Sequence, residues 1–96
     1  MAAYVIADIE VQDPELYREY AALVPATLEP FGGRYLVRGG NPEPLDGSWA
    51  PRRLVVVEFP SADHARRWHA SPEYRTAMAI RHRASAGSLV LVEGTG

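Results

Sequence analysis

The chain has 96 residues, a formal net charge of −2 and a hydrophobic content of 47%. This length is typical of one small core, so we expect residues 1–96 to form a single domain that is too apolar to be disordered. The slightly acidic balance gives no general attraction to phosphate backbones or to anionic lipid surfaces, which argues against nucleic-acid and membrane partners. Because the chain has no cysteine, it can have neither a disulfide framework nor a thiolate nucleophile.

The amino-terminal segment does not have the pattern of a targeting sequence. No basic region precedes its apolar run, and Asp8 and Glu10 interrupt that run, so we expect neither a signal peptide nor an anchor. No stretch approaches the roughly 18 apolar residues of a membrane-spanning helix. We therefore predict a cytoplasmic location.

The first half of the chain predicts a strand, a helix and a second strand. Residues 4–11 alternate between apolar and polar side chains, which is typical of a half-buried strand. A helix is expected from Asp13, a natural N-cap followed by proline, to the glycine pair at residues 32–33. Pro25 lies inside this helix, where we expect a kink or a break between two segments.

The second half continues this alternation of strands and helices. Residues 34–40 and 51–60 are predicted strands joined by a long, ragged hairpin, with Asp46-Gly47 at its tip and a bulge at Gly39-Gly40. Two consecutive helices begin at the capping residues Ser61 and Ser71, and residues 88–94 form a last strand. The resulting βαββαβ order predicts an α+β, ferredoxin-like sandwich whose antiparallel sheet has the order 4-1-3-2, with both helical segments on one face.

The face of the sheet away from the helices carries an unusual mixture of residues. Strict alternation places Ile6, Leu36, Leu54 and Val56 there together with four charged side chains: Asp8, Arg34, Arg38 and Glu58. An apolar patch of this kind is more often an interaction surface than a solvated one, which predicts that two copies pack sheet to sheet. Antiparallel pairing would place Arg34 beside Glu58 and Asp8 within reach of Arg38, either as structural ion pairs or as groups that contact a ligand.

Several segments of the chain resemble a known family. The stretch FGGRYLVRGG, then DGSWAPRRLVVVEFPS, then ASPEYRTAMAIR are similar to the domain of unknown function 1330 (DUF1330) family, small proteins of the dimeric α+β barrel superfamily. The resemblance extends from Tyr4 to Gly94. It implies a homodimer in which two sheets face each other and enclose a cavity.

The resemblance implies no particular reaction. The superfamily also contains cofactor-free monooxygenases, haem-degrading enzymes, muconolactone-type isomerases and cyclases, so membership is an analogy at the level of fold. Haem binding is kept as an alternative because His64 and Trp68, four residues apart, share a helix face. Otherwise the resemblance implies no cofactor.

Other chemical classes have little support in the sequence. The three histidines lack the spacing of a metal site, so no metal is expected. Ser61 and Ser71 are caps rather than nucleophiles, and the glycine pairs lack the spacing of a phosphate-binding loop. The third strand offers aliphatic residues where an RNA-recognition module would display aromatic ones.

A small-molecule site is what remains. We predict a homodimer that binds, or acts without a cofactor on, a small organic acid or aromatic metabolite in the barrel cavity; the alternative is a non-catalytic dimeric module without a ligand, and whether the protein is an enzyme stays open. The candidate acid or base groups are Glu58 and Asp8, because burial would raise the pKa of either carboxyl. The candidate ligand-binding residues are Arg38, which would hold an anion, and Arg34, Tyr4, Trp49, Trp68, His69 and Tyr74.

Overall fold

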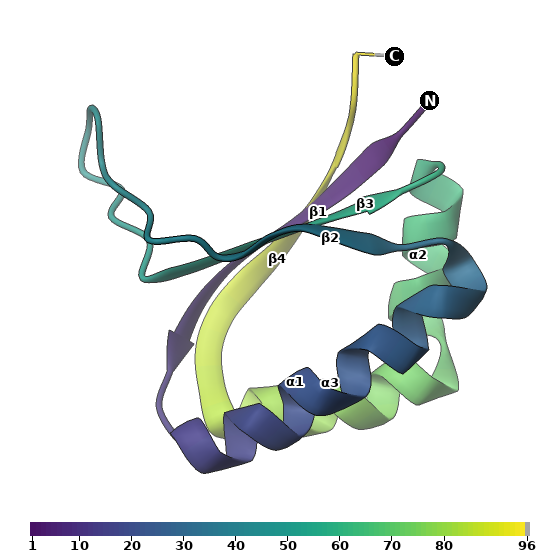
Figure 1. Cartoon of the computed structure of the whole chain (residues 1–96), viewed down its shortest axis with the longest axis horizontal. Coiled ribbons are helices and arrows are strands. Elements are labelled where there is room, and N and C mark those ends of the chain that lie inside the picture. The colour runs from purple at the N-terminus through teal and green to yellow at the C-terminus, as the bar shows by residue number, and fades with distance from the viewer. Residues whose placement is uncertain (96) are drawn as a thin grey trace.

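The computed structural model describes residues 1–95. Its sheet is antiparallel with the order β2-β3-β1-β4, as predicted, and the helices cover one face of it (Figure 1). The fold is therefore the ferredoxin-like α+β sandwich. In chain order the elements are β1 (Ala3–Val11), α1 (Pro14–Leu28), a 3₁₀ turn (Glu29–Phe31), β2 (Arg34–Gly39), β3 (Arg53–Phe59), α2 (Ala62–Ala70), α3 (Pro72–Ala84) and β4 (Ser85–Glu93).

The three helices begin at the predicted caps. The side chains of Asp13, Ser61 and Ser71 each accept a hydrogen bond from the backbone N–H three residues later, which satisfies one of the donors that a helix start leaves free. Ser71 both ends α2 and begins α3. No helix of residues 1–95 has the length and hydropathy needed to cross a membrane.

Of the two outcomes expected at Pro25, a kink or a break, the break does not occur. α1 continues as one helix to Leu28, and the N–H of Glu29 bonds to the carbonyl of Pro25. A proline removes only its own N–H from the hydrogen-bond ladder, and the residues on either side of it, Val24 and Thr27, remain buried. Gly32 then ends the helical segment in the left-handed conformation, with a φ of 70°.

The core is an aromatic cluster between the helices and the sheet. Phe59 and Tyr74 are completely buried, and Trp68 lies between them, with ring centroids 5.3 Å and 4.0 Å away respectively. The indole N–H of Trp68 donates to Thr27 at 3.0 Å, so the one polar atom of this ring has a partner inside the core. This cluster fixes α2 and α3 against β3.

A β-bulge in β2 changes which face its residues occupy. Arg34 pairs with Glu58 and Tyr35 pairs with Val57, but Val37 then pairs with Val56, so Leu36 is an extra residue. Beyond a one-residue insertion the side chains exchange faces. The prediction that Arg38 shares a face with Arg34 is therefore wrong: Arg38 pairs with Val55 and lies on the helix side.

The long connection between β2 and β3, residues 40–52, is called the arm below. It has no strand pairing and rises from one end of the sheet, away from the helices (Figure 1). Gly39 and Gly40 have positive φ values and lead from β2 into the arm. A bulge was predicted at this pair, but the bulge of β2 is at Leu36. Leu45, near the predicted tip, is almost fully exposed.

Candidate functional site

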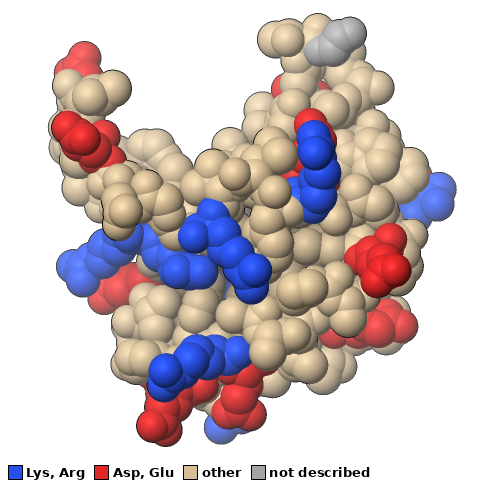
Figure 2. Space-filling model, in the orientation of Figure 1, with Lys and Arg blue, Asp and Glu red and all other residues tan. Residues whose placement is uncertain are grey.

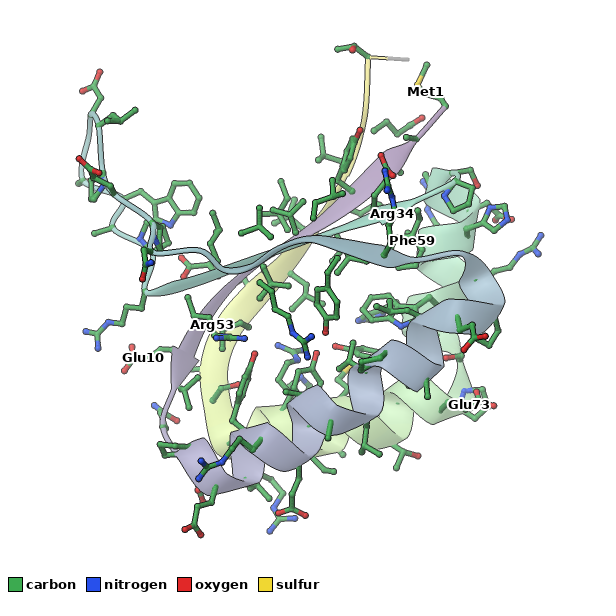
Figure 3. All side chains as sticks on the ribbon, in the orientation of Figure 1. Met1, Glu10, Arg34, Arg53, Phe59 and Glu73 are labelled. Atoms are coloured by element: carbon green, nitrogen blue, oxygen red, sulfur yellow. The ribbon has the colours of Figure 1, made fainter. Side chains whose placement is uncertain are left out.

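The predicted site residues lie on two sides of the sheet rather than around one cavity. Figure 3 shows Arg34 on the side away from the helices and Arg53 on the side of α1. We call the first side the open face. The structure places there five of the predicted residues: Tyr4, Asp8, Arg34, Trp49 and Glu58. The other four, Arg38, Trp68, His69 and Tyr74, are on the helix side.

Both predicted acid or base groups on the open face already have partners. Glu58 accepts a hydrogen bond from Arg34 Nε at 2.7 Å, as antiparallel pairing predicted. Asp8 accepts a hydrogen bond from the indole N–H of Trp49 at 2.8 Å. The expected approach of Arg38 to Asp8 does not occur, because the bulge in β2 turns Arg38 to the other face.

A shallow polar groove runs along the same face. It has a volume of about 270 Å³ and lies between the base of the arm and the start of β4; its lining includes Asp8, Glu10, Arg52 and Ser88. Glu10 and Arg52 are only loosely paired, at 4.0 Å. Within residues 1–95 no three histidine, aspartate or glutamate side chains come together in a way that could hold a metal ion.

The helix side contains three neighbouring cavities, which we call the interlayer cavities. The outer one has about 230 Å³ and opens between α2 and β4, where Trp68 and His69 line it. A middle one of about 30 Å³ shares Trp68 and Leu89 with the outer cavity. An inner one, also about 30 Å³, shares Tyr20 and Tyr35 with the middle cavity.

Two arginines line the inner cavity. The guanidinium of Arg38 lies 4.5 Å from the centroid of the Tyr35 ring, and that of Arg53 lies 5.4 Å from the Tyr17 ring. Such cation–π contacts orient a guanidinium without neutralising its charge. Among residues 1–95 neither arginine forms an ion pair with a carboxylate, so the inner end of the interlayer cavities is positively charged.

Burial determines the protonation states around these cavities. It raises the pKa of Tyr35, although Arg38 opposes the rise, and it raises the pKa of Tyr20 still further, aided by the neighbouring Tyr74. Both phenols are therefore neutral hydrogen-bond donors near pH 7. His69 behaves in the opposite sense: burial, with help from Arg75, Arg81 and His82, lowers its pKa and favours the neutral imidazole.

The haem alternative does not fit this geometry. His64 is held at the start of α2, where its Nδ1 lies 2.7 Å from Ser61 Oγ, and it does not line the outer cavity beside Trp68. That cavity is also smaller than the roughly 300–1,000 Å³ that enclose drug-sized ligands.

Sequence reasoning missed three residues of the helix side: Tyr17, Arg53 and Arg81. Arg53 could have been found, because the alternation that buries Val57 and Val55 places residue 53 on the same face. Arg81 also carried a signal, since it follows the buried Tyr74 and Ala77 at helical spacing. The exchange of Arg38 to this face had no such signal, because the bulge at Leu36 carries neither glycine nor proline.

Solved structures with this fold are numerous, and three are informative. A protein of unknown function from Rhodopseudomonas palustris superposes with a TM-score of 0.79 at 17% identity, covering 99% of this chain and 83% of its own. A dimeric protein of unknown function with a ferredoxin-like fold, from Bacteroides fragilis, has a TM-score of 0.69 at 16% identity and covers 97% and 96%. SnoaB, a cofactor-independent oxygenase from Streptomyces nogalater, has a TM-score of 0.67 at 14% identity and covers 99% and 94%.

These structural similarities establish the fold, and family membership rests on the sequence. No curated protein matches the chain. The profile of the family described as "Domain of unknown function (DUF1330)" matches residues 2–95, which is nearly the whole chain. The chain is therefore a member of the DUF1330 family.

Proposed function

We propose that the protein is a homodimer that binds a small aromatic molecule in the interlayer cavities of each subunit and acts on it without a cofactor. The observation that carries this proposal is the outer cavity of about 230 Å³ beside Trp68. A cavity of about 150 Å³ is enough to bind benzene in another protein. The outer cavity therefore suits a molecule of one or two rings.

The homodimer is supported by the open face. Leu36, Val90 and Val92 are between 44% and 59% exposed there, and a second sheet would cover them. Figure 2 shows a largely uncharged hollow between the arm and the chain ends, of a shape that a second copy could enter. The structural neighbour from Bacteroides fragilis is described as dimeric.

The chemistry proposed for the outer cavity begins with a proton transfer. His69 lines this cavity, and its neutral imidazole can accept a proton from a phenolic or carbon acid held against Trp68. The proton moves from the ligand to a ring nitrogen and leaves an anionic ligand. The neighbour SnoaB is described as a cofactor-independent oxygenase, a class in which the protein supplies no metal or flavin.

A second candidate places the ligand between the two sheets of the dimer. The groove of about 270 Å³ beside Asp8 on the open face favours it, because a second sheet would convert this groove into an enclosed space. Asp8 and Glu58 would then be the acid or base groups, and Tyr4, Arg34 and Trp49 would be the contacts. This arrangement requires both carboxylates to exchange their present partners for a ligand.

Two neighbouring residues of β4 distinguish these locations. Leu89 lines the outer and middle interlayer cavities, whereas Ser88 lines the groove on the open face. We would screen aromatic and aliphatic acids, phenols and their neutral analogues by thermal shift, since a bound ligand raises the melting temperature. For each ligand found, Leu89→Phe and Ser88→Phe would then be compared.

A ligand in the interlayer cavities should lose its effect in Leu89→Phe and keep it in Ser88→Phe. The reverse result would place the ligand between the sheets and contradict the first proposal. If no compound in the screen stabilises the wild-type protein, the alternative of a dimeric module without a ligand is favoured.

A further inference from the structure

We propose that the inner end of the interlayer cavities is an oxyanion site, so that the ligand is an aromatic carboxylate or phenolate whose charged group binds beside Arg38 and Arg53. This inference rests on the proposed function, since it names the class of ligand for the same cavities. It depends on three arginines of the helix side, Arg38, Arg53 and Arg81, which come from three different elements.

None of these three arginines forms an ion pair with another residue in 1–95. The ion pairs in that range are Arg34–Glu58, Arg52–Glu10 and Arg67–Asp63. Figure 2 shows basic surface gathered below the arm, while acidic surface lies at the arm tip and at the outer edges. The helix side thus holds positive charge that the described part of the chain does not neutralise.

Arg81 is the most unusual of the three. It lies on the inner face of α3, only 6% exposed, and its Nε has no hydrogen-bond partner. Its Nη2 lies 3.2 Å from the ring nitrogen Nε2 of the adjacent His82. A buried guanidinium without a counterion is costly, and an anion bound on the helix side would offset part of that cost.

Tyr20 connects Arg81 to the inner cavity. Arg81 lies on the same buried face of α3 as Tyr74, two turns further along, and its positive charge opposes the rise in the pKa of Tyr20. Tyr20 itself lines the inner and middle cavities, and its hydroxyl is 3.0 Å from that of Tyr74. Arg81 therefore adds positive potential behind the wall of the cavity, whereas Arg38 and Arg53 line the cavity directly.

The nitrogen Nε of Arg53 is a second unsatisfied donor. It is buried and has no hydrogen-bond partner, although Arg53 is less enclosed than Arg81. Buried polar atoms in native proteins nearly always have a partner. The unpartnered Nε of Arg53 and the guanidinium of Arg38 both line the inner cavity, and guanidinium donors of this kind recognise carboxylate or phenolate oxygens.

The inner cavity is small and lies beside an exposed arginine. It holds about 30 Å³, which is close to the share of liquid volume of one water molecule, so a carboxylate or phenolate oxygen fits it and an aromatic ring does not. Arg53 is partly buried there, whereas Arg38 is exposed. The ring of a bound acid therefore lies outside the inner cavity, with its charged group beside the two guanidinium groups.

The experiment compares acids with neutral analogues of the same shape. Benzoate, cinnamate and 2-naphthoate would each be paired with the primary amide, and affinities would be measured by isothermal titration calorimetry. We expect each acid that binds to do so at least about tenfold more tightly than its amide, because a charged hydrogen bond contributes more than a neutral one. Arg38→Gln and Arg53→Gln should each remove most of this preference and leave amide affinity nearly unchanged.

Arg67→Gln is the matched control, because Arg67 is an exposed arginine of α2 that is paired with Asp63 and lines none of the interlayer cavities. It should leave both affinities unchanged. Amides that bind as tightly as acids, or a loss of acid affinity in Arg67→Gln equal to that in Arg38→Gln, would overturn the oxyanion site. If neither member of any pair binds, the proposed ligand-binding function fails as well, which distinguishes the two failures.

Arg81→Gln can fail to fold, so Arg81→Lys would be studied beside it. Lysine keeps the positive charge but loses the planar fork of donors. Because Arg81 acts through the wall of the cavity, we expect Arg81→Lys to retain the preference for acids over amides and Arg81→Gln, where it folds, to reduce it. Loss of the preference in a folded Arg81→Lys variant would contradict this role.

Discussion

The two faces of the sheet use arginine in opposite ways. On the open face Arg34 is paired with Glu58, and Arg52 lies near Glu10. On the helix side Arg38 and Arg53 lie over tyrosine rings and have no ion pair with any residue in 1–95. Paired charges mainly maintain local geometry, whereas an unpaired cation beside a cavity is available to an external anion.

Two arginines of the same strand therefore have different surroundings. Arg34 and Arg38 lie four positions apart on β2, and the bulge at Leu36 between them reverses the alternation of faces. Without the bulge both arginines would lie on the open face, and the inner cavity would keep only Arg53 of the two arginines that line it. The bulge at Leu36 thus accounts for the concentration of positive charge on the helix side.

The largest difference between the faces is expected for the two tryptophans. Trp68 is buried on the helix side and donates a hydrogen bond to Thr27, so Trp68→Ala should lower the free energy of unfolding by about 3–5 kcal/mol. Trp49 is 60% exposed and donates one hydrogen bond to Asp8, so Trp49→Ala should lower it by no more than about 1 kcal/mol. Urea denaturation of both variants measures this difference.

Equal losses in the two variants would contradict the assignment of the core to one face. The comparison requires the same oligomeric state for wild type and variants, which light scattering can establish. Trp68→Phe is a useful intermediate, because it keeps a ring in the core but removes the hydrogen bond to Thr27.

The next effect concerns the proposed dimer. Val90 is 59% exposed on the open face, opposite Ile6, so Val90→Asp would bury an unpaired carboxylate if a second sheet covers it. We expect a weakening of the dimer by at least about 100-fold, or roughly 3 kcal/mol. Analytical ultracentrifugation over a range of concentrations would measure it.

Leu23 provides the control for this substitution. It is 43% exposed but lies on α1, outside the buried face of the helix, so Leu23→Asp should leave the dimer unchanged. Dissociation by both substitutions would indicate general destabilisation, and dissociation by neither would exclude the open face as the dimer interface.

The sequence was sufficient to predict the fold and one of the ion pairs. Period-two alternation, three helix caps and the order of elements lead to the sheet order that is observed. Antiparallel pairing of β2 with β3 also leads correctly to Arg34 and Glu58. These features depend on local residue patterns and on the rules that govern connections between strands, and both can be identified from a single sequence.

The candidate site was less predictable, because it depends on features without a local pattern. Strict alternation assigned Arg38 to the open face, and nothing in the residues around Leu36 indicates the insertion that moves it. Trp68 and Tyr74 were grouped with Asp8 and Glu58, although the sheet separates them. Which face a side chain occupies after a bulge is decided by tertiary packing rather than by propensity.

A smaller effect is expected for the pair Arg34–Glu58. Its side chains are 70% and 23% exposed, and exposed pairs contribute about 0.2–1 kcal/mol. A double-mutant cycle with Arg34→Ala and Glu58→Ala should therefore give a coupling energy below about 1 kcal/mol at concentrations where the protein is monomeric. A clearly larger coupling in the dimer would mean that a second sheet covers this pair.

The smallest expected effect is a pH dependence that belongs to His69. Burial and the neighbouring Arg75 and Arg81 lower its pKa below the ordinary value of 6.5 in the folded chain, so the unfolded chain takes up a proton first as the pH falls. The free energy of unfolding should therefore decrease as the pH drops below about 6.5, and His69→Gln should make this decrease shallower between pH 7.5 and 5.5.

His64→Gln is the matched histidine variant, since His64 lies on the same helix but bonds to Ser61. Thermal unfolding of the three proteins across this pH range would measure the slopes. If His69→Gln keeps the wild-type slope while His64→Gln makes it shallower, the imidazole beside the outer cavity is not the neutral base that the proposed proton transfer requires. If His69→Gln alone reduces the slope, the pH dependence belongs to the imidazole that burial, with help from the neighbouring positive charges, keeps neutral.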